Sequence, residues 1–223
     1  MSVGGFVGRL FFKESKMRVL TDLEPKNVFS FFEDICSIPH PSYKEEKISN
    51  YLVEFAKARG LEHYQDELHN VIIIKEASEG YEDVEPIILQ GHMDMVCEKN
   101  NGTKHDFDND PIETIVDGEW LRANGTTLGA DNGIGVAAEL ALLASDDIQH
   151  GPIECLFTVD EETGLTGAKA LKEGFMTGDI LLNLDSEDEG EIFMGCAGGK
   201  DTQATFHYEP VPTSDKMQYF RID

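Results

Sequence analysis

The sequence predicts an α/β fold, in which apolar strands alternate with helices along most of the chain. Two observations support this prediction. Short continuous runs rich in β-branched residues recur, as is typical of strands buried on both faces of a sheet. Between these runs, apolar residues recur at the spacing of a helix face.

Two helices are expected near the amino terminus. The first follows Pro25, which the opening turn of a helix tolerates, and its apolar residues recur at helical spacing as far as Ile35. A turn around Pro39 ends it, because residues before proline avoid the α region. In the second helix, Ser42 is expected to be the N-terminal cap and Gly60 the C-terminal cap.

The remaining elements follow from the same signals. In order, we expect strands at 63–65, 70–75 and 86–90, a short strand at 120–121, a helix from Asp131 to 144, a strand at 153–159, a helix at 168–171 and a strand at 179–184. After Asp188 the pattern changes, and strands are expected at 191–195 and 201–208. These last two are interpreted as the beginning of another sheet.

The charge of the chain excludes some partners. Its 43 acidic residues outnumber its 18 basic residues, so the formal net charge is −25. Such a surface repels nucleic-acid backbones and anionic membranes, and neither is expected as a partner. The 4 cysteines are widely spaced, which fits free thiols in a reducing compartment. We therefore expect a cytoplasmic protein.

Four acidic clusters stand out, because each one follows a predicted strand or opens the predicted helix. They contain His92 with Asp94, then Asp131, then the pair Glu161 and Glu162, and finally Asp185. One imidazole and several carboxylates are ligands that divalent metals prefer. Carboxylates this close repel one another unless a cation lies among them. The clusters therefore predict a metal-dependent hydrolase.

The position of each cluster suggests a role. Asp131 lies close to glycines that allow a close backbone approach, so it suits a carboxylate that bridges two metals. His92 and Asp185 offer terminal ligands. Asp94 lies two residues after His92, on the same side of an extended segment, and can orient the imidazole.

Glu161 and Glu162 are adjacent, so their side chains point in different directions. One of them can bind metal while the other acts as a general base toward water. Each cluster alone has an ordinary explanation, such as a turn, a helix cap or a solvated helix start. Their order beside successive strands favours a shared site.

Five segments resemble the co-catalytic zinc aminopeptidase and dipeptidase family, and most of all its aminoacyl-histidine dipeptidase branch. They are Ile38 to Ser42, Leu89 to Cys97, Thr127 to Gly135, Phe157 to Gly164 and Leu182 to Glu187. The resemblance implies a mixed sheet flanked by helices, followed by the start of an inserted lid domain. It also implies hydrolysis of dipeptides with a free amino terminus, often with histidine second, as in carnosine.

The resemblance assigns roles that agree with those above. It implies two zinc ions, with cobalt or manganese as substitutes. His92 and Asp185 resemble the ligands of one zinc, Asp131 the bridging carboxylate and Glu162 a ligand of the other zinc. Glu161 resembles the general base and Asp94 the residue that orients His92.

The sequence departs from the family at one ligand. The family's second zinc takes a further histidine from a later part of a longer chain, and no residue here matches it. We therefore interpret 1–16 as an extension, 17–187 as the amino-terminal part of the catalytic domain and 188–223 as the start of the lid domain. A chain of this kind is expected to show little peptidase activity and to bind one zinc better than two.

Other functions stay open at this stage. An N-acyl amino acid deacylase of the same family would differ only in substrate. A non-catalytic metal-binding fragment is a second alternative, although Glu161 would then have no task. A two-metal phosphatase is disfavoured, because no arginine cluster for phosphate is visible. The expected partner is a small peptide substrate, and a homodimer is left open.

Overall fold

The computed structural model describes residues 18–186, 188, 190–200, 202–212, 216–218 and 220. The predicted extension over 1–16 therefore lies outside the described residues. The chain divides into two units, residues 1–187 and residues 188–223.

The second unit has no helix or strand among its described residues. The strands expected at 191–195 and 202–208 are therefore wrong, and Asp201 lies outside the described residues. A strand needs a partner for its backbone groups and cover for its apolar side chains. Neither is found here, since Ile192 is 95% exposed and Phe206 is 83% exposed.

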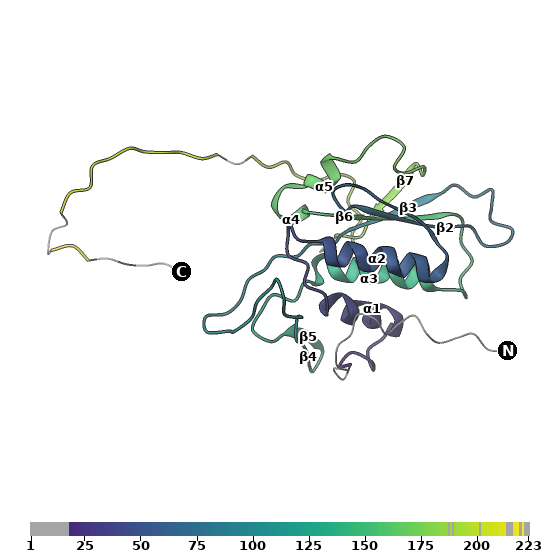
Figure 1. The fold of residues 1–223 in the computed structure, drawn as a ribbon, viewed down its shortest axis with the longest axis horizontal. Coiled ribbons are helices and arrows are strands. Elements are labelled where there is room, and N and C mark those ends of the chain that lie inside the picture. Colours follow the sequence, from purple (N-terminus) through teal and green to yellow (C-terminus); the bar gives the residue numbers. More distant parts are fainter. Residues whose placement is uncertain are drawn as a thin grey trace. The chain divides into compact units, whose positions relative to one another are not determined.

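The first unit is built on a five-stranded mixed sheet, which confirms the predicted fold class (Figure 1). Its strand order is β1-β2-β6-β3-β7. Strand β6 pairs antiparallel with β2 and parallel with β3, and β3 pairs parallel with β7. The strands are β1 (Glu62–Gln65), β2 (Val71–Lys75), β3 (Ile87–His92), β6 (Ile153–Thr158) and β7 (Ile180–Asn183).

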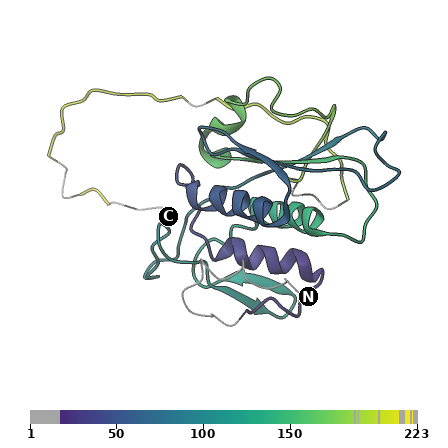
Figure 2. The ribbon, with the colours of Figure 1, turned by 45° about the vertical axis from the view of Figure 1, so that its right-hand side comes forward.

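Helices cover one face of this sheet in two layers (Figures 1 and 2). Helices α2 (Glu46–Arg59) and α3 (Ala130–Ala144) pack against the strands, and α1 (Lys26–Cys36) packs against α3. A separate hairpin of β4 (Thr114–Asp117) and β5 (Trp120–Ala123) lies beyond α1 in both views. Among the described residues, no helix has the length and apolar character needed to cross a membrane.

The burial of β6 and β7 follows from their positions in the sheet. All six residues of β6 are buried, as its continuous apolar run predicts for a central strand. The residues of β7 are exposed, because this strand forms the edge of the sheet next to β3. The side chains of Ile180, Leu181 and Leu182 are each about half exposed.

The ends of the helices partly match the prediction. Gly60 caps α2 with a left-handed conformation at φ 67°, as expected. Ser42 is not the N-terminal cap of that helix, because Glu45 occupies the cap position. The hydroxyl of Ser42 instead donates to Asp94.

Three elements differ from the prediction. The sequence pattern missed β4 and the four-residue helix α4 (Glu161–Gly164), which are too short for a periodic signal. Helix α5 (Thr166–Lys169) begins two residues before the predicted segment. Gly167 lies in α5, where an added Cβ would clash with the backbone of Val159, so packing against the end of β6 fixes this turn.

The core predicts unequal losses from two truncations in the same helix. Leu140 in α3 is fully buried, and we expect Leu140→Ala to lower the free energy of unfolding by about 2–5 kcal/mol. Ile134, also in α3, is partly exposed, and Ile134→Ala should cost about 1 kcal/mol or less. Urea denaturation of both variants measures the difference. Equal losses would show that α3 does not face the core as described.

Candidate metal centre

The carboxyl ends of three parallel strands form the base of the site. His92 is the last residue of β3. Asp160 lies two residues after the end of β6, and Asp185 lies two residues after the end of β7. Because β6 and β7 each pair in parallel with β3, which lies between them, the carboxyl ends of all three strands meet at one edge of the sheet. Ligands bind at such edges in α/β proteins.

The start of α3 brings Asp131 to the same edge. Gly129 precedes the helix in a left-handed conformation at φ 72°, where an added Cβ would also press on Met95. Asp131 and Asn132 have non-helical backbone angles, and the peptide bond between them is cis. The regular helix begins after them, so the Asp131 carboxylate is free to face β3.

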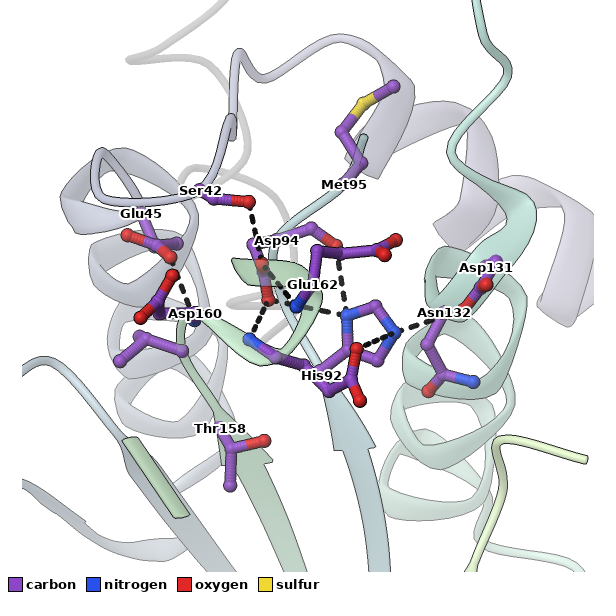
Figure 3. A network of polar contacts seen from close by, with 12 residues as sticks. Ser42, Glu45, His92, Asp94, Met95, Asp131, Asn132, Thr158, Asp160 and Glu162 are labelled. Carbon is purple, nitrogen blue, oxygen red and sulfur yellow. Dashed lines mark hydrogen bonds and ion pairs between the residues drawn. The ribbon is translucent and has the colours of Figure 1, made fainter. Parts of the chain in front are cut away.

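The residues that the sequence singled out lie around the imidazole of His92, and Figure 3 shows Asp94, Asp131 and Glu162 among them. Its Nε2 lies 3.0 Å from Asp131 Oδ1, 3.8 Å from Asp185 Oδ2 and 4.0 Å from Glu161 Oε2. Ligand atoms of His92, Asp131 and Glu162 lie within 4.8 Å of one another. One imidazole nitrogen and several carboxylate oxygens thus share a small volume.

Charge repulsion at this point is visible in the pKa values. Burial alone would lower the pKa of His92, but the carboxylates of Asp94, Asp131 and Asp185 outweigh it and raise the pKa to about 9. Burial and repulsion from Asp131 raise the pKa of Asp185 to about 6, against the attraction of His92. The same two causes raise the pKa of Glu162. The group therefore carries more negative charge than one imidazole can balance, and its donor set fits a divalent cation.

Asp94 connects two of the elements that form the site. Its carboxylate accepts backbone N–H bonds from Glu161 at 2.9 Å and Glu162 at 3.2 Å, and a bond from the Ser42 hydroxyl at 2.8 Å. His92 Nδ1 lies 3.0 Å from the backbone oxygen of Asp94 and 3.3 Å from its Oδ1. Burial would raise the pKa of Asp94, but these hydrogen bonds lower it. One carboxylate thus fixes both the imidazole and the start of α4.

A second acidic group lies behind the first. Glu45, Asp94 and Asp160 are buried with oxygens within 4.8 Å of one another. Glu45 accepts the backbone N–H of Asp160 at 2.9 Å, and Asp160 accepts the hydroxyls of Thr163 and Thr166. Because donors of the protein already occupy these oxygens, the group holds the turn before α4, where Asp160 adopts φ 53°.

Sequence reasoning missed Asn132, Glu45 and Asp160 as supporting residues. Asn132 Nδ2 donates to the backbone oxygen of Leu184 at 2.8 Å and to Asp185 Oδ1 at 3.2 Å, so it ties α3 to the end of β7. The sequence feature that could have identified Asn132 is its position directly after Asp131. Glu45 had no sequence signal, because its partner Asp160 lies 115 residues away.

The mixed sheet and its cluster of possible metal ligands place the chain among α/β proteins that hold metal-ligating side chains at strand ends. Within this class, the chain belongs to the peptidase family M20/M25/M40, whose family model matches residues 88–215. The matched part includes all six residues that the sequence singled out.

Individual relatives agree with this family. The cytosol non-specific dipeptidase of Escherichia coli K12 is 50% identical over 206 residues, which are 92% of this chain and 42% of that protein. Peptidase T of Macrococcus caseolyticus is 31% identical over 144 residues, which are 60% of this chain and 35% of that protein. The chain thus spans less than half the length of these relatives.

Solved structures give the same result. The aminoacylhistidine dipeptidase of Vibrio alginolyticus has a TM-score of 0.76 and 52% sequence identity, over 78% of this chain and 36% of that one. The aminopeptidase PepT of Bacillus cereus has a TM-score of 0.62 and 26% identity, over 73% of this chain and 44% of that one. Both the fold and the resemblance stated from sequence are confirmed.

The contacts of Asp94 predict its contribution to stability. Asp94→Ala leaves the backbone N–H groups of Glu161 and Glu162 and the Ser42 hydroxyl without their acceptor. We expect it to lower the free energy of unfolding by about 1–3 kcal/mol. Ser42→Ala removes one donor only, leaves Asp94 bonded, and should cost about 1 kcal/mol or less. Urea denaturation of the metal-free chain at neutral pH measures both, and a loss for Ser42→Ala as large as that for Asp94→Ala would contradict this account.

Proposed function

We propose that the protein is a metal-dependent dipeptidase. The main support is the group of His92, Asp131, Glu161, Glu162 and Asp185 at one edge of the sheet, with His92 Nε2 only 3.0 Å from Asp131 Oδ1. Carboxylates at such distances repel one another, and a pair of divalent cations bound among them and the imidazole would remove this repulsion. The family and the names of its members support a peptide as the substrate.

Each residue has a role in this proposal. Asp131 would bridge the two metal ions, His92 and Asp185 would hold one, and Glu162 would hold the other. The bound metals would polarise the peptide carbonyl and make a water more acidic. Zinc suits this set of nitrogen and carboxylate ligands, and cobalt or manganese would be substitutes.

Glu161 is the proposed general base. Its carboxylate takes a proton from the attacking water while the water oxygen adds to the carbonyl carbon. The same proton then passes from Glu161 to the amine nitrogen as the C–N bond breaks, so Glu161 ends in its original state. The backbone bonds from Glu161 and Glu162 to Asp94 support this role, because they hold in place the first turn of α4, which carries both side chains.

The finer substrate class is part of the proposal. The Vibrio relative is named for aminoacyl-histidine substrates, whereas the Escherichia coli relative is named non-specific. We propose dipeptides with histidine second, carnosine included, as preferred substrates within a broader range. A cytoplasmic location accords with the name of the Escherichia coli relative and with four free cysteines.

A pair of variants tests Glu161 as the base. Glu161→Gln should lower turnover of dipeptides about 10²–10⁴-fold, because the proton acceptor is lost. Its zinc affinity should stay within about threefold, because the ligands remain. Glu173→Gln removes an exposed carboxylate elsewhere and is the matched control. Turnover of dipeptides is measured on the purified wild type and both variants, and zinc binding by calorimetry.

The metal ligands predict the opposite pattern. Asp131→Asn should lower zinc affinity more than about tenfold, because an amide oxygen bridges two cations poorly.

Competition between histidine dipeptides and N-acetylated amino acids separates a dipeptidase from a deacylase. Faster cleavage of the acylated substrates would overturn the proposed activity, and full zinc affinity in Asp131→Asn would overturn the proposed site.

A further inference from the structure

A buried acid lies behind the candidate metal centre. Glu139 is on the face of α3 that packs against β3, where it also reaches Cys155 of β6, and its side chain is fully buried. Its carboxyl group lies beside the thiol of Cys155 in β6, and apart from that weak donor neither of its oxygens has a hydrogen-bond partner among the described residues. An unpaired charged carboxylate in such a place would be very costly, so this group needs an explanation.

The amide oxygen of Asn132 is likewise buried without a hydrogen-bond donor among the described residues. Asn132 is 3% exposed, and its Oδ1 is buried without a partner in the described part of the chain. A Cβ added at Gly91 in β3 would lie 3.0 Å from Glu139 Oε1 and still closer to Asn132 Oδ1. The two unpaired oxygens therefore converge over the same glycine, which leaves room for both.

Two oxygens that both only accept hydrogen bonds repel each other, and a single proton between them removes the conflict. Burial raises the pKa of Glu139 well above its ordinary value, although a hydrogen bond with the Cys155 thiol acts in the opposite direction. A neutral carboxylic acid has an O–H group that can donate, and Asn132 Oδ1 is the unsatisfied acceptor beside it.

We propose that Glu139 is a positioning residue, which donates a hydrogen bond from its neutral acid to Asn132 Oδ1. This bond orients the Asn132 amide so that its Nδ2 faces Leu184 and Asp185, to which it donates at 2.8 Å and 3.2 Å. The connection runs from Glu139 through Asn132 to Asp185. Its consequence for metal binding rests on the proposed function, in which Asp185 is a ligand.

Two variants separate positioning from packing. Glu139→Gln keeps a neutral donor of the same length, so zinc affinity of the purified chain should stay within about threefold. Glu139→Met fills a similar volume without a donor, and zinc affinity should fall about 10–100-fold. Calorimetric titration with zinc alone measures both, and Ile134→Ala is the control for a change in α3 that leaves this contact intact. Unchanged affinity in Glu139→Met would overturn the proposal.

The proton itself can be tested without metal. If the acid is neutral in the folded chain, the unfolded chain releases its proton above about pH 4.5, and wild-type stability falls as pH rises. Glu139→Gln cannot titrate, so its melting temperature relative to wild type should increase from about pH 5 to about pH 8. An infrared carbonyl band of a protonated acid should also be present at neutral pH in the wild type and absent from Glu139→Gln.

These measurements stand apart from catalysis. A constant difference in melting temperature, or no protonated-acid band, would overturn the neutral acid even if Glu139→Met failed to fold. Neither measurement depends on peptide turnover. A protein without peptidase activity could thus still carry this hydrogen bond, and an active peptidase could lack it.

Discussion

Repulsion among carboxylates around one imidazole is the constraint that organises this molecule. Asp131, Asp185 and Glu162 approach His92 from three elements, and nothing in the described residues offers a second positive group near them. A chain can keep such a group together only if its backbone holds each member firmly. The parallel ends of β6, β3 and β7 and the start of α3 provide that support.

Hydrogen bonds behind the site complete this support. Asp94 accepts from the first turn of α4 and from Ser42, and Glu45 accepts from Asp160. These acidic side chains accept hydrogen bonds from backbone N–H groups and hydroxyls, and Asp94 also faces the imidazole of His92. The acidic residues around the site therefore include some that repel one another at the sheet edge and others that local donors stabilise. Sequence composition counts both kinds alike.

The sequence was most informative where a pattern is local. Continuous apolar runs identified β2, β3 and β6, and Gly60 identified the end of α2, because strand burial and helix capping depend on neighbouring residues. The residues of the candidate site were recognisable because each follows a predicted strand or opens a predicted helix. Ser42 was misread as a helix cap because its actual partner, Asp94, lies 52 residues away. Glu139 gave only a weak signal, as a single acid within the apolar run of α3, and its burial depends on strands that come both before and after it.

The edge strand β7 has a practical consequence. Among the described residues it pairs with β3 alone, and Ile180, Leu181 and Leu182 are about half exposed along it. Uncovered apolar edges invite other chains to add a strand, which leads to aggregation. Concentrated solutions of this polypeptide should therefore self-associate through β7, which light scattering can detect.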